Sequence, residues 1–337
     1  MANVLITGGL GFIGANLVRQ IQEQDPESTI IVVDDFGSGD KWNNWNRLFL
    51  KSVGIVSIEE FYKNVDYFLK KFSTDYNIHT IVHLGAISST QEKDVDKIWH
   101  ANVELTERLL KSSNEAGYKF IFASSAGVYG AGEHGFSETI QLEDLKPLTP
   151  YAFSKLIIEK RIAKNYKDSS KIFVVRFFNV WGLGDSHKIG MQSWASQLMN
   201  NKSKYENLIQ LPCLLDHEGK LPERDFVYVK DVAKLLITII EADEFPYKTI
   251  NCGTGHAVSF KQFAEIFFKV KYKTPPKIQW EETKFAKRRD YQYFTKADTT
   301  LLYNVGFHTT DLKTEIEEYI HEYTLLFDST HPSDWKH

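Results

Sequence analysis

Five short apolar runs, separated by amphipathic segments, dominate the first 180 residues. The runs are continuous rather than alternating, which is typical of strands covered on both faces of a parallel sheet. Helical spacing fills the gaps, and between the first two runs Leu17, Val18 and Ile21 share one helix face. Strands that alternate with helices predict an α/β protein with a Rossmann-type, doubly wound parallel sheet. The five runs lie at 3–9, 28–35, 79–86, 118–125 and 171–180.

The pattern changes after Trp181. Residues 182–225 are rich in polar and loop-forming positions and include Pro212 and Pro222. The chain then returns to a strand-like run, a long apolar helix and a run that ends in glycines. We therefore expect a Rossmann domain at 1–180 with strand and helix returns near 226–255, and a smaller mixed α/β C-terminal lobe formed by 181–225 and 256–337.

Composition narrows the class of protein. The 337 residues carry a formal net charge of −4, which excludes a general nucleic-acid binder with a strongly basic surface. No apolar run approaches membrane-spanning length, and the first run is typical of a strand rather than a leader, so we expect no membrane partner. Cys213 and Cys252 are far apart and are expected to be free thiols in a reducing, cytoplasmic compartment.

A glycine-rich stretch, TGGLGFIG at 7–14, follows the first predicted strand and opens the first predicted helix. Gly8, Gly11 and Gly14 allow the backbone to approach a pyrophosphate, and a helix N-terminus supplies N–H donors and positive potential. Asp34 ends the second strand, about 20 residues further on, where an acid binds adenosine ribose hydroxyls. Together these features predict a dinucleotide site; a glycine turn without a ligand is the alternative.

The residues that follow the second strand leave two forms of the dinucleotide open. Asp34 and Asp35 would repel a 2′-phosphate and so favour NAD. Lys41 could reach such a phosphate if its loop folds back. The expected cofactor is therefore NADP or NAD.

PYAFSK carries Tyr151 and Lys155 four residues apart at the start of a helical pattern, and so on one helix face. A phenol is a weak acid at neutral pH, but a nearby ammonium lowers its pKa and lets it exchange a proton with a substrate hydroxyl. Ser124 and Ser125 end the fourth strand, at the sheet edge where ligands bind. Each feature alone also fits a structural role, and no residue set predicts a metal site.

Five ordered motifs, TGGLGFIG, HLGA, SSAGVYG, YAFSK and RFFNVWG, together resemble the extended short-chain dehydrogenase/reductase (NAD-dependent epimerase/dehydratase) family. The similarity covers essentially the whole chain, since ERDFVYVKDVA and NCGTG also fit, and it points to nucleotide-sugar epimerases and dehydratases. It implies one tightly bound NADP or NAD per subunit, and Ser125, Tyr151 and Lys155 as catalytic residues. Beside Tyr151, Lys155 and Lys41, the implied cofactor contacts are Gly8, Gly11, Phe12, Ile13, Gly14, Asp34, Asp35, Leu84, Gly85, Ala86, Ser88, Asn102 and Val180.

Within the family, dehydratases carry carboxylates after the serine position, and Ser-Ala-Gly at 125–127 sets dehydration aside. HLGAISSTQEKD, NVWGLGDSHKIGM and RDYQYFTKADTT resemble the ADP-L-glycero-D-manno-heptose 6-epimerases, in which a lysine at the position of Lys188 is a second acid/base opposite the tyrosine. The resemblance thus implies conversion of ADP-D-glycero-D-manno-heptose to ADP-L-glycero-D-manno-heptose at C6, where the two epimers direct their oxygen differently. The implied substrate contacts are Ser89, Asn179, His187, Gly190, Gln197, Arg224 and Tyr291.

Several positions depart from that pattern. Trp181 replaces a tyrosine, Leu183 a proline, Ile189 a glycine and Asp290 an arginine, and the stretch 214–225 is longer. A UDP- or GDP-sugar epimerase, or a keto-sugar reductase of the same family, therefore stays open. In the reductase, His187 or Lys188 would donate a proton in one direction only.

The alternative from another class is a non-catalytic NAD(P)-binding regulator. The intact Ser125, Tyr151 and Lys155 argue against it, because a regulator has no need of a proton relay. Arg224 could likewise pair with Asp225 or Asp231 rather than bind a phosphate. The expected partners are a nucleotide sugar, ADP-heptose above all, and further copies of the chain in a homo-oligomer that associates through 103–113 and 151–166.

Overall fold

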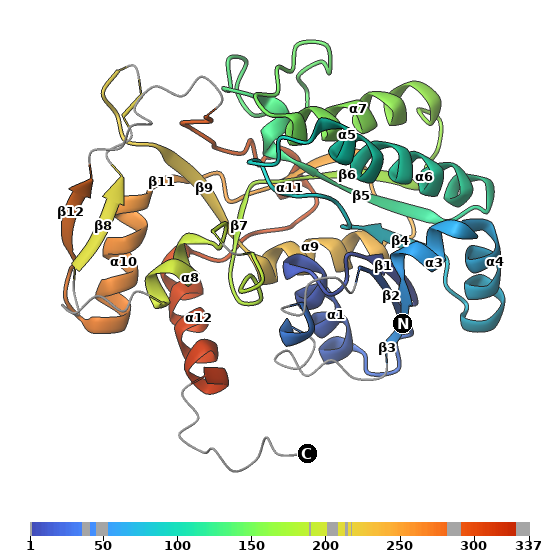
Figure 1. Cartoon of the computed structure of the whole chain (residues 1–337), viewed down its shortest axis with the longest axis horizontal. Helices are drawn as coiled ribbons and strands as arrows, with labels where there is room; N and C mark the ends of the chain where they lie inside the picture. Colours follow the sequence, from blue (N-terminus) through green and yellow to red (C-terminus); the bar gives the residue numbers. More distant parts are fainter. Residues whose placement is uncertain are drawn as a thin grey trace.

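The computed structural model describes residues 2–35, 41–44, 53–188, 190–200, 208–212, 215–216, 218–281 and 291–327. Its main layer is a seven-stranded sheet in the order β10-β6-β5-β4-β1-β2-β3, with parallel neighbours throughout (Figure 1). The strands are β1 (Val4–Thr7), β2 (Ile30–Asp34), β3 (Val53–Ser57), β4 (Thr80–His83), β5 (Lys119–Ser125), β6 (Ile172–Phe177) and β10 (Thr249–Cys252).

Burial explains why the predicted runs form strands. β1, β2, β4 and β6 are buried along their whole length, as continuous apolar runs inside a covered sheet should be. The chain passes from β1 to β2 on one side and later returns to β4 on the other side of β1. This reversal is a topological switch point, and ligands of doubly wound sheets bind outside the carboxyl ends of the strands beside it.

Helices cover both faces of this sheet, which confirms the predicted fold class (Figure 1). On one face, α1 (Phe12–Gln24) packs against α9 (Val229–Glu241), and both share a core with Val4 and Ile6 of β1. Leu5 points into the opposite core, under helices that include α4 and α7. The helices of that face are α3 (Ile58–Lys63), α4 (Val65–Tyr76), α5 (Val95–Ile98), the π-helix η1 (Trp99–Glu104), α6 (Leu105–Glu115) and α7 (Pro150–Asn165).

A second, smaller group of elements lies at the left of Figure 1. It contains a three-stranded sheet, β11-β9-β7, and a parallel pair, β12-β8. Trp181, Phe226, Phe263, Phe267 and Tyr319 form the centre of its aromatic core. Its elements are β7 (Asn179–Trp181), α8 (Trp194–Met199), β8 (Leu208–Pro212), β9 (Glu223–Tyr228), β11 (Ala257–Ser259), α10 (Phe260–Tyr272), β12 (Lys277–Glu281) and α12 (Leu312–Phe327).

The structure refines two details of the predicted organisation. The strand that starts the 226–255 return, β9, pairs with β7 and β11 of the small sheet, whereas α9 and β10 do rejoin the main fold. β3 is an edge strand that the sequence pattern does not single out, because Gly54 interrupts its apolar run and α3 starts directly after it. The short helix α11 (Thr300–Asn304) lies near β10.

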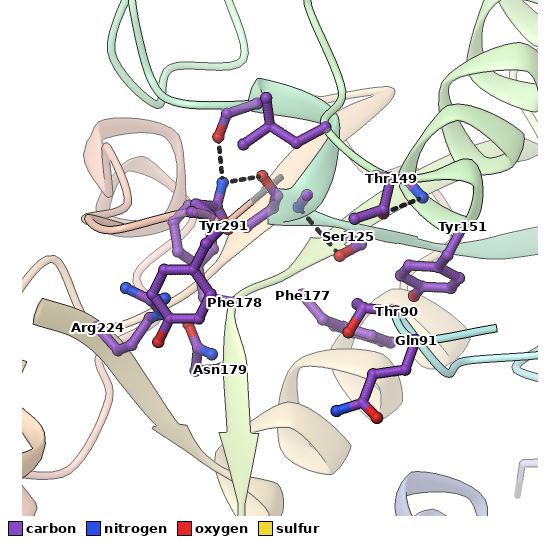
Figure 2. A pocket seen from close by; sticks show the side chains of 16 residues that line it. Thr90, Gln91, Ser125, Thr149, Tyr151, Phe177, Phe178, Asn179, Arg224 and Tyr291 are labelled. Atoms are coloured by element: carbon purple, nitrogen blue, oxygen red, sulfur yellow. Dashed lines mark hydrogen bonds between the residues drawn. The ribbon is translucent and has the colours of Figure 1, made fainter. Parts of the chain in front are cut away.

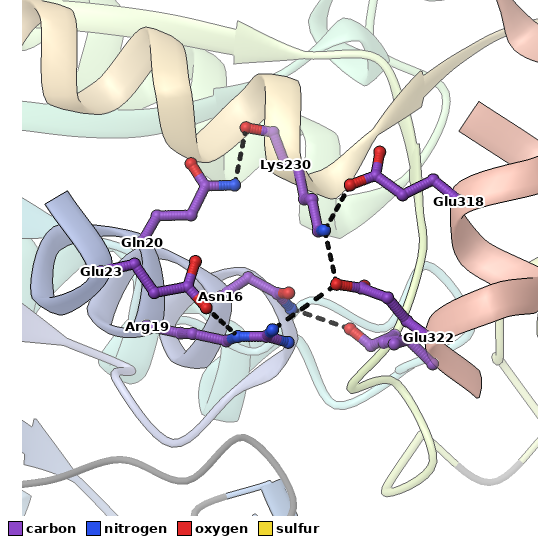
Figure 3. A network of polar contacts seen from close by, with 8 residues as sticks. Asn16, Arg19, Gln20, Glu23, Lys230, Glu318 and Glu322 are labelled. Carbon is purple, nitrogen blue, oxygen red and sulfur yellow. Dashed lines mark hydrogen bonds and ion pairs between the residues drawn. The ribbon is translucent and has the colours of Figure 1, made fainter. Parts of the chain in front are cut away.

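A polar network joins α12 to the helix pair α1–α9 (Figure 3). Lys230 of α9 lies 2.6 Å from both Glu318 and Glu322 of α12. Arg19 of α1 reaches Glu322 at 3.5 Å, and Gln20 donates to the Lys230 carbonyl at 3.1 Å. Partly exposed ion pairs of this kind each contribute little to stability, so the network mainly fixes how the helices lie against one another. Within the ranges that the structure describes, no helix combines the length and apolarity required to cross a membrane.

Candidate active site

The glycine stretch forms a tight loop between β1 and α1. Gly8 has φ +72°, and a Cβ there would lie 2.7 Å from the Gly85 nitrogen. A Cβ at Gly14 would collide with the Gly8 carbonyl oxygen. The absence of side chains at both positions lets the loop pack tightly, with Gly8 against the end of β4. The N-terminus of α1 therefore opens onto the switch point, as a pyrophosphate site requires.

A cavity of about 330 Å³ runs along this edge of the sheet. Besides the predicted cofactor contacts, Thr7, His83, Ser124 and Phe177 also line it. An elongated site that joins a glycine loop, an acid pair and a buried amine fits a nicotinamide dinucleotide. The predicted residues that line the cavity are Gly8, Gly11, Phe12, Ile13, Gly14, Asp34, Asp35, Lys41, Leu84, Gly85, Ala86, Ser88, Tyr151, Lys155, His187 and Lys188.

The acid end of this cavity already contains a cation. The buried Asp34 carboxylate accepts from the Leu10 backbone N–H at 2.8 Å and from Lys41 Nζ at 2.8 Å. Lys41 also reaches Asp35 at 2.7 Å. Burial opposes the charge of Lys41, but the two carboxylates outweigh it and raise the lysine pKa. The carboxylate that would bind a ribose hydroxyl and the ammonium that would bind a 2′-phosphate thus lie side by side.

Two predicted cofactor contacts lie elsewhere. Asn102 is buried behind the loop that follows β4: its Oδ1 accepts from the Ile87 N–H at 2.8 Å, and its Nδ2 donates to the Ile87 carbonyl at 3.0 Å. It therefore shapes the cavity wall without lining it. Val180 lines a neighbouring cavity of about 210 Å³, together with Phe12 and Lys188.

Tyr151 and Lys155 share one face of α7. The helix starts where Thr149 Oγ1 accepts from the Ala152 N–H at 3.2 Å, with Pro150 in the first turn. Lys155 Nζ lies 5.9 Å from the centroid of the Tyr151 ring. Ser125 ends β5 opposite them, just before the 3-10 helix η2 (Ala126–Tyr129) (Figure 2). The structure therefore brings Ser125, Tyr151 and Lys155 together: Tyr151 and Lys155 line the cofactor cavity, and Ser125 lines a second cavity that Tyr151 also borders.

Burial perturbs both titratable groups at this point. It lowers the pKa of Lys155 to about 7, and the nearby Glu159 carboxylate acts in the opposite direction. Burial raises the pKa of Tyr151, whereas the hydrogen-bond contact with Ser125 lowers it. An amine whose pKa lies near neutrality, next to a phenol, is suited to proton exchange at physiological pH.

A second cavity, of about 280 Å³, lies on the other side of Tyr151 and Ser125 (Figure 2). The predicted substrate residues Asn179, Arg224 and Tyr291 line it. Thr90 and Gln91 also line it, whereas the predicted Ser89 does not. The Ser89 hydroxyl accepts from the Gln91 N–H at 3.2 Å.

Arg224 is a buried cation without a carboxylate partner among the described residues. Its guanidinium lies 5.0 Å from the Tyr291 ring centroid and donates to the Glu223 carbonyl at 2.9 Å. Burial lowers its pKa, and Tyr291 opposes that effect. Asp225 is not its partner, because this carboxylate accepts from the N–H groups of 254, 255 and 297. Arg224 is therefore suited to meet a phosphate.

Lys188 lies between the cofactor cavity and the smaller cavity that contains Val180. Its ammonium is 5.1 Å from the ring centroid of Phe12. Burial lowers its pKa, while Asp185 acts to raise it. Lys188 thus faces the cofactor cavity from a loop, on a different element from Tyr151.

The other predicted residues of this loop are distributed unevenly. Gln197 lines the smaller cavity and donates to the Gln192 carbonyl at 2.8 Å. Gly190 lies in an exposed turn with φ +74° and lines none of the cavities described above. Ile189 and Asp290, two of the departures from the expected pattern, lie outside the described residues.

With the site assembled, comparison with known proteins identifies the family. A model of the NAD dependent epimerase/dehydratase family matches residues 4–253. The chain belongs to this family. The ADP-L-glycero-D-manno-heptose-6-epimerase of Brachyspira hyodysenteriae is 34% identical over 309 residues, covering 90% of this chain and 92% of the relative. That of Nitratidesulfovibrio vulgaris (strain DP4) is 29% identical over 330 residues, covering 96% and 98%.

Solved structures confirm the fold of this epimerase/dehydratase family member. The ADP-L-glycero-D-manno-heptose-6-epimerase of Helicobacter pylori superimposes with a TM-score of 0.76 at 23% identity and covers 96% of each chain. The UDP-N-acetylglucosamine 4-epimerase of Methanobrevibacter ruminantium gives 0.74 at 23% identity, with 98% and 99% covered. Family membership makes the protein NAD-dependent, in agreement with the glycine loop and the lined cavity.

Sequence reasoning missed some residues of this family member's site. Gln292 donates to the carbonyls of Ala126 at 3.3 Å and Gly130 at 2.6 Å, and so ties the segment with Tyr291 to the turn after Ser125. Its position next to Tyr291 was the available signal. His83 is fully buried at the end of β4, and burial and Lys155 lower its pKa to about 3, so it is neutral.

Proposed function

We propose that the protein interconverts ADP-D-glycero-D-manno-heptose and ADP-L-glycero-D-manno-heptose at C6, with tightly bound NAD or NADP. The observation that carries this proposal is the presence of two partly buried proton carriers, Tyr151 and Lys188, on separate elements of one cofactor cavity. The names of the relatives at 29–34% identity over nearly the full chain support the choice of sugar nucleotide.

Proton transfer would begin at Tyr151. Its phenol oxygen removes the hydroxyl proton of one epimer, while Lys155 favours the phenolate by its charge and Ser125 donates a hydrogen bond to the reacting oxygen. NAD(P), when bound, accepts a hydride from C6 and returns it. The glycine loop and the α1 N-terminus would hold its pyrophosphate.

Lys188 would act on the other epimer. When the C6 carbonyl presents its opposite face, its oxygen points away from Tyr151, and a second group must supply or remove the proton. Burial shifts the pKa of Lys188 downward, the direction that favours a neutral amine able to accept a proton. Its place between the cofactor cavity and the cavity with Asn179 and Gln192 suits that role.

The substrate would lie in the second cavity, with Arg224 on its diphosphate. A further cavity of about 180 Å³ continues from Tyr291 and is lined in part by the aromatic side chains of Trp194, Phe260 and Trp280. We infer that the nucleotide base stacks there. Under this proposal the Rossmann part (1–180 with the α9 and β10 returns) holds the cofactor and one wall of the substrate cavity, while 181–225 with 256–337 supplies Arg224, Tyr291 and the cavity for the base.

One assay tests the proposal and its alternatives. The purified protein is incubated with ADP-, GDP- and UDP-sugars without added cofactor, and epimers are followed by NMR. We expect the ADP-heptose epimers to interconvert through retained cofactor. Conversion of a UDP- or GDP-sugar would instead identify another epimerase, a requirement for stoichiometric reduced cofactor would identify a reductase, and no turnover would favour a regulator.

We also propose a cytoplasmic homo-oligomer. Cys252 is a buried free thiol, as suits a reducing compartment, while Cys213 lies outside the described residues. Val95 of α5 and Phe153 of α7 are 55% and 50% exposed on neighbouring helices, which supports subunit contact there. Sedimentation analysis of the parent protein and of Phe153→Glu tests this: a smaller species in the variant supports association through α7.

A further inference from the structure

The loop that carries Lys188 is held to the cofactor half of the molecule by two asparagine amides. Asn16 of α1 (Figure 3) donates from Nδ2 to the Leu183 carbonyl at 2.8 Å. Asn44 donates from Nδ2 to the next carbonyl, that of Gly184, also at 2.8 Å. Two side chains from separate segments therefore fix two consecutive peptide groups just before Lys188.

Asn44 also contacts the glycine loop. Its side chain is buried, with 1% exposed, and its Nδ2 also donates to the Leu10 carbonyl in the glycine loop at 3.1 Å. His187 Nδ1 lies 3.3 Å from the same nitrogen. One amide thus joins the pyrophosphate loop to the residues immediately before Lys188.

Lys41, three residues before Asn44, binds Asp34 and Asp35 at the adenosine end of the cavity. Within residues 41–44, described as helical, the chain therefore links the two ends of the cofactor site. An adenosine ribose or 2′-phosphate that engages Lys41 acts on the same short segment that holds Gly184.

On its other side the loop is fixed to the substrate lobe. Asp185 accepts from the Ser193 N–H at 2.5 Å and from Ser196 Oγ at 2.6 Å, at the start of α8. Its carbonyl accepts from the Lys188 N–H at 2.9 Å. With Asp185 fixing the substrate side, the cofactor-side attachment decides how far the Lys188 amine lies from the cofactor.

We propose that Asn44 is a positioning residue that places the Lys188 amine by tying its loop to the glycine loop, so that cofactor binding and placement of this amine are coupled. The proposal rests on the proposed role of Lys188. Gly184 has φ +103°, and a Cβ there would lie 3.2 Å from Asn16 Nδ2, so the absence of a side chain lets this backbone come close to the amide that anchors it.

Chemical labelling tests this placement without any substrate. The full-length protein, with and without NAD or NADP, is treated with trace acetic anhydride, and acetylation of Lys188 is measured by mass spectrometry relative to the exposed Lys164. We expect slow labelling of Lys188 in the parent, slower still with cofactor, and labelling on the order of tenfold faster in Asn44→Ala and Asn44→Asp, with the cofactor effect lost. Asn43→Ala is the matched control and should label as the parent does.

Unchanged Lys188 labelling in a folded Asn44 variant overturns the proposal. Asn44→Asp keeps the size of the side chain and decides the matter if Asn44→Ala fails to fold by circular dichroism. Altered labelling in a protein that epimerises no sugar would contradict the proposed function and still support the positioning role. The two proposals therefore fail separately.

Kinetics supply a second readout that a general loss of structure would not reproduce. We expect Asn44→Ala to lower kcat by about tenfold or more, with little change in substrate KM, because misplacement of a reacting group acts on the chemical step. The double variant Asn44→Ala/Lys188→Met should be no slower than Lys188→Met alone. Additive losses would contradict an action of Asn44 through Lys188.

Discussion

Tyr151 and Lys188 line the same cavity, but they stand on different kinds of support. Tyr151 lies in the first turn of a 16-residue helix, α7, whose own backbone hydrogen bonds fix the direction of the side chain. Lys188 lies on a loop that is anchored by side chains of Asn16, Asn44 and Asp185. The helix thus places its residue by local rules, whereas the loop depends on each separate contact.

Helix α7 is also joined to the sheet by a buried ion pair and hydrogen bonds. Glu159, two turns after Tyr151, accepts from Arg176 of β6 through Nε at 3.1 Å and Nη2 at 2.5 Å, and from Ser124 Oγ. Arg176 also donates to the Tyr129 hydroxyl at 2.8 Å. The difference between the two supports predicts that the Tyr151 site tolerates single changes nearby better than the Lys188 site does.

The largest effect is expected at Tyr151 itself. Tyr151→Phe removes the phenol oxygen and should reduce epimerisation by about 10⁴-fold, at the upper end for a general acid/base, while the cofactor stays bound. NMR of the epimers and absorbance of bound cofactor measure the two quantities. Tyr166→Phe, at the far end of α7, is the control and should turn over as the parent does. Full activity in Tyr151→Phe would contradict its catalytic assignment.

Glu159→Gln tests the buried ion pair that joins α7 to the sheet, because it leaves the Arg176 cation buried and without its charged partner. We expect the free energy of unfolding to fall by about 3–4 kcal/mol in urea titrations. Glu107→Gln breaks the partly exposed pair that Arg161 of α7 makes, and should cost less than about 1 kcal/mol. Equal losses in the two variants would show that α7 does not depend on the buried pair.

Lys188→Met tests the role of the amine that the loop carries. The change keeps an unbranched side chain over Phe12 and removes the amine, so the fold should be unaffected. We expect interconversion to fall by about 100-fold, with cofactor content unchanged. Lys164→Met on the exposed face of α7 is the matched control. A Lys188→Met protein that interconverts the epimers at the parent rate would rule out the mechanism with two proton carriers.

The same difference of support explains what the sequence could predict. The strands, α1 and α7 follow from apolar runs and helical spacing, so Gly8, Tyr151 and Lys155 could be placed at one sheet edge from local patterns. Lys188 could be assigned only by resemblance, because no periodicity determines where a loop residue lies. The edge strand β3 and the pairing of β9 with the small sheet were missed for a similar reason, since strand partners are set by tertiary packing.

Individual side chains show the same limit. Asn102 was expected at the cofactor, yet its amide is used by Ile87, a choice that depends on the three-dimensional course of the chain. Asn44 carries no sequence signal, and Gln292 only its place beside Tyr291, because their partners are backbone carbonyls from distant segments. Motifs therefore indicated the side chains that line the cavities better than the side chains that hold them in place.

A second buried glutamate contrasts with Glu159. Glu315 of α12 is buried against α9, and neither of its carboxyl oxygens receives a hydrogen bond from a described donor. Burial first, and then Asp231, Asp311 and Glu318, raise its pKa to about 10. Asp231 accepts from the Thr310 N–H at 2.7 Å and has a raised pKa of its own. Glu315 is therefore protonated in the folded protein and can donate to Asp231.

The raised pKa of Glu315 makes the stability of the folded protein depend on pH. The unfolded chain releases this proton above a pKa of about 4.3, whereas the folded protein retains it up to about pH 10, so stability falls as the pH rises between these values. Glu315→Gln stays neutral throughout, so its stability relative to the parent should rise by about 1.4 kcal/mol per pH unit between pH 5 and pH 8.5, on the order of 5 kcal/mol in all. Urea unfolding at both pH values measures this, with the exposed Glu317→Gln as control. Arg19 of α1 contacts α12. If Asn44, rather than this contact between the two helices, fixes the loop, Glu315→Gln should leave Lys188 labelling unchanged.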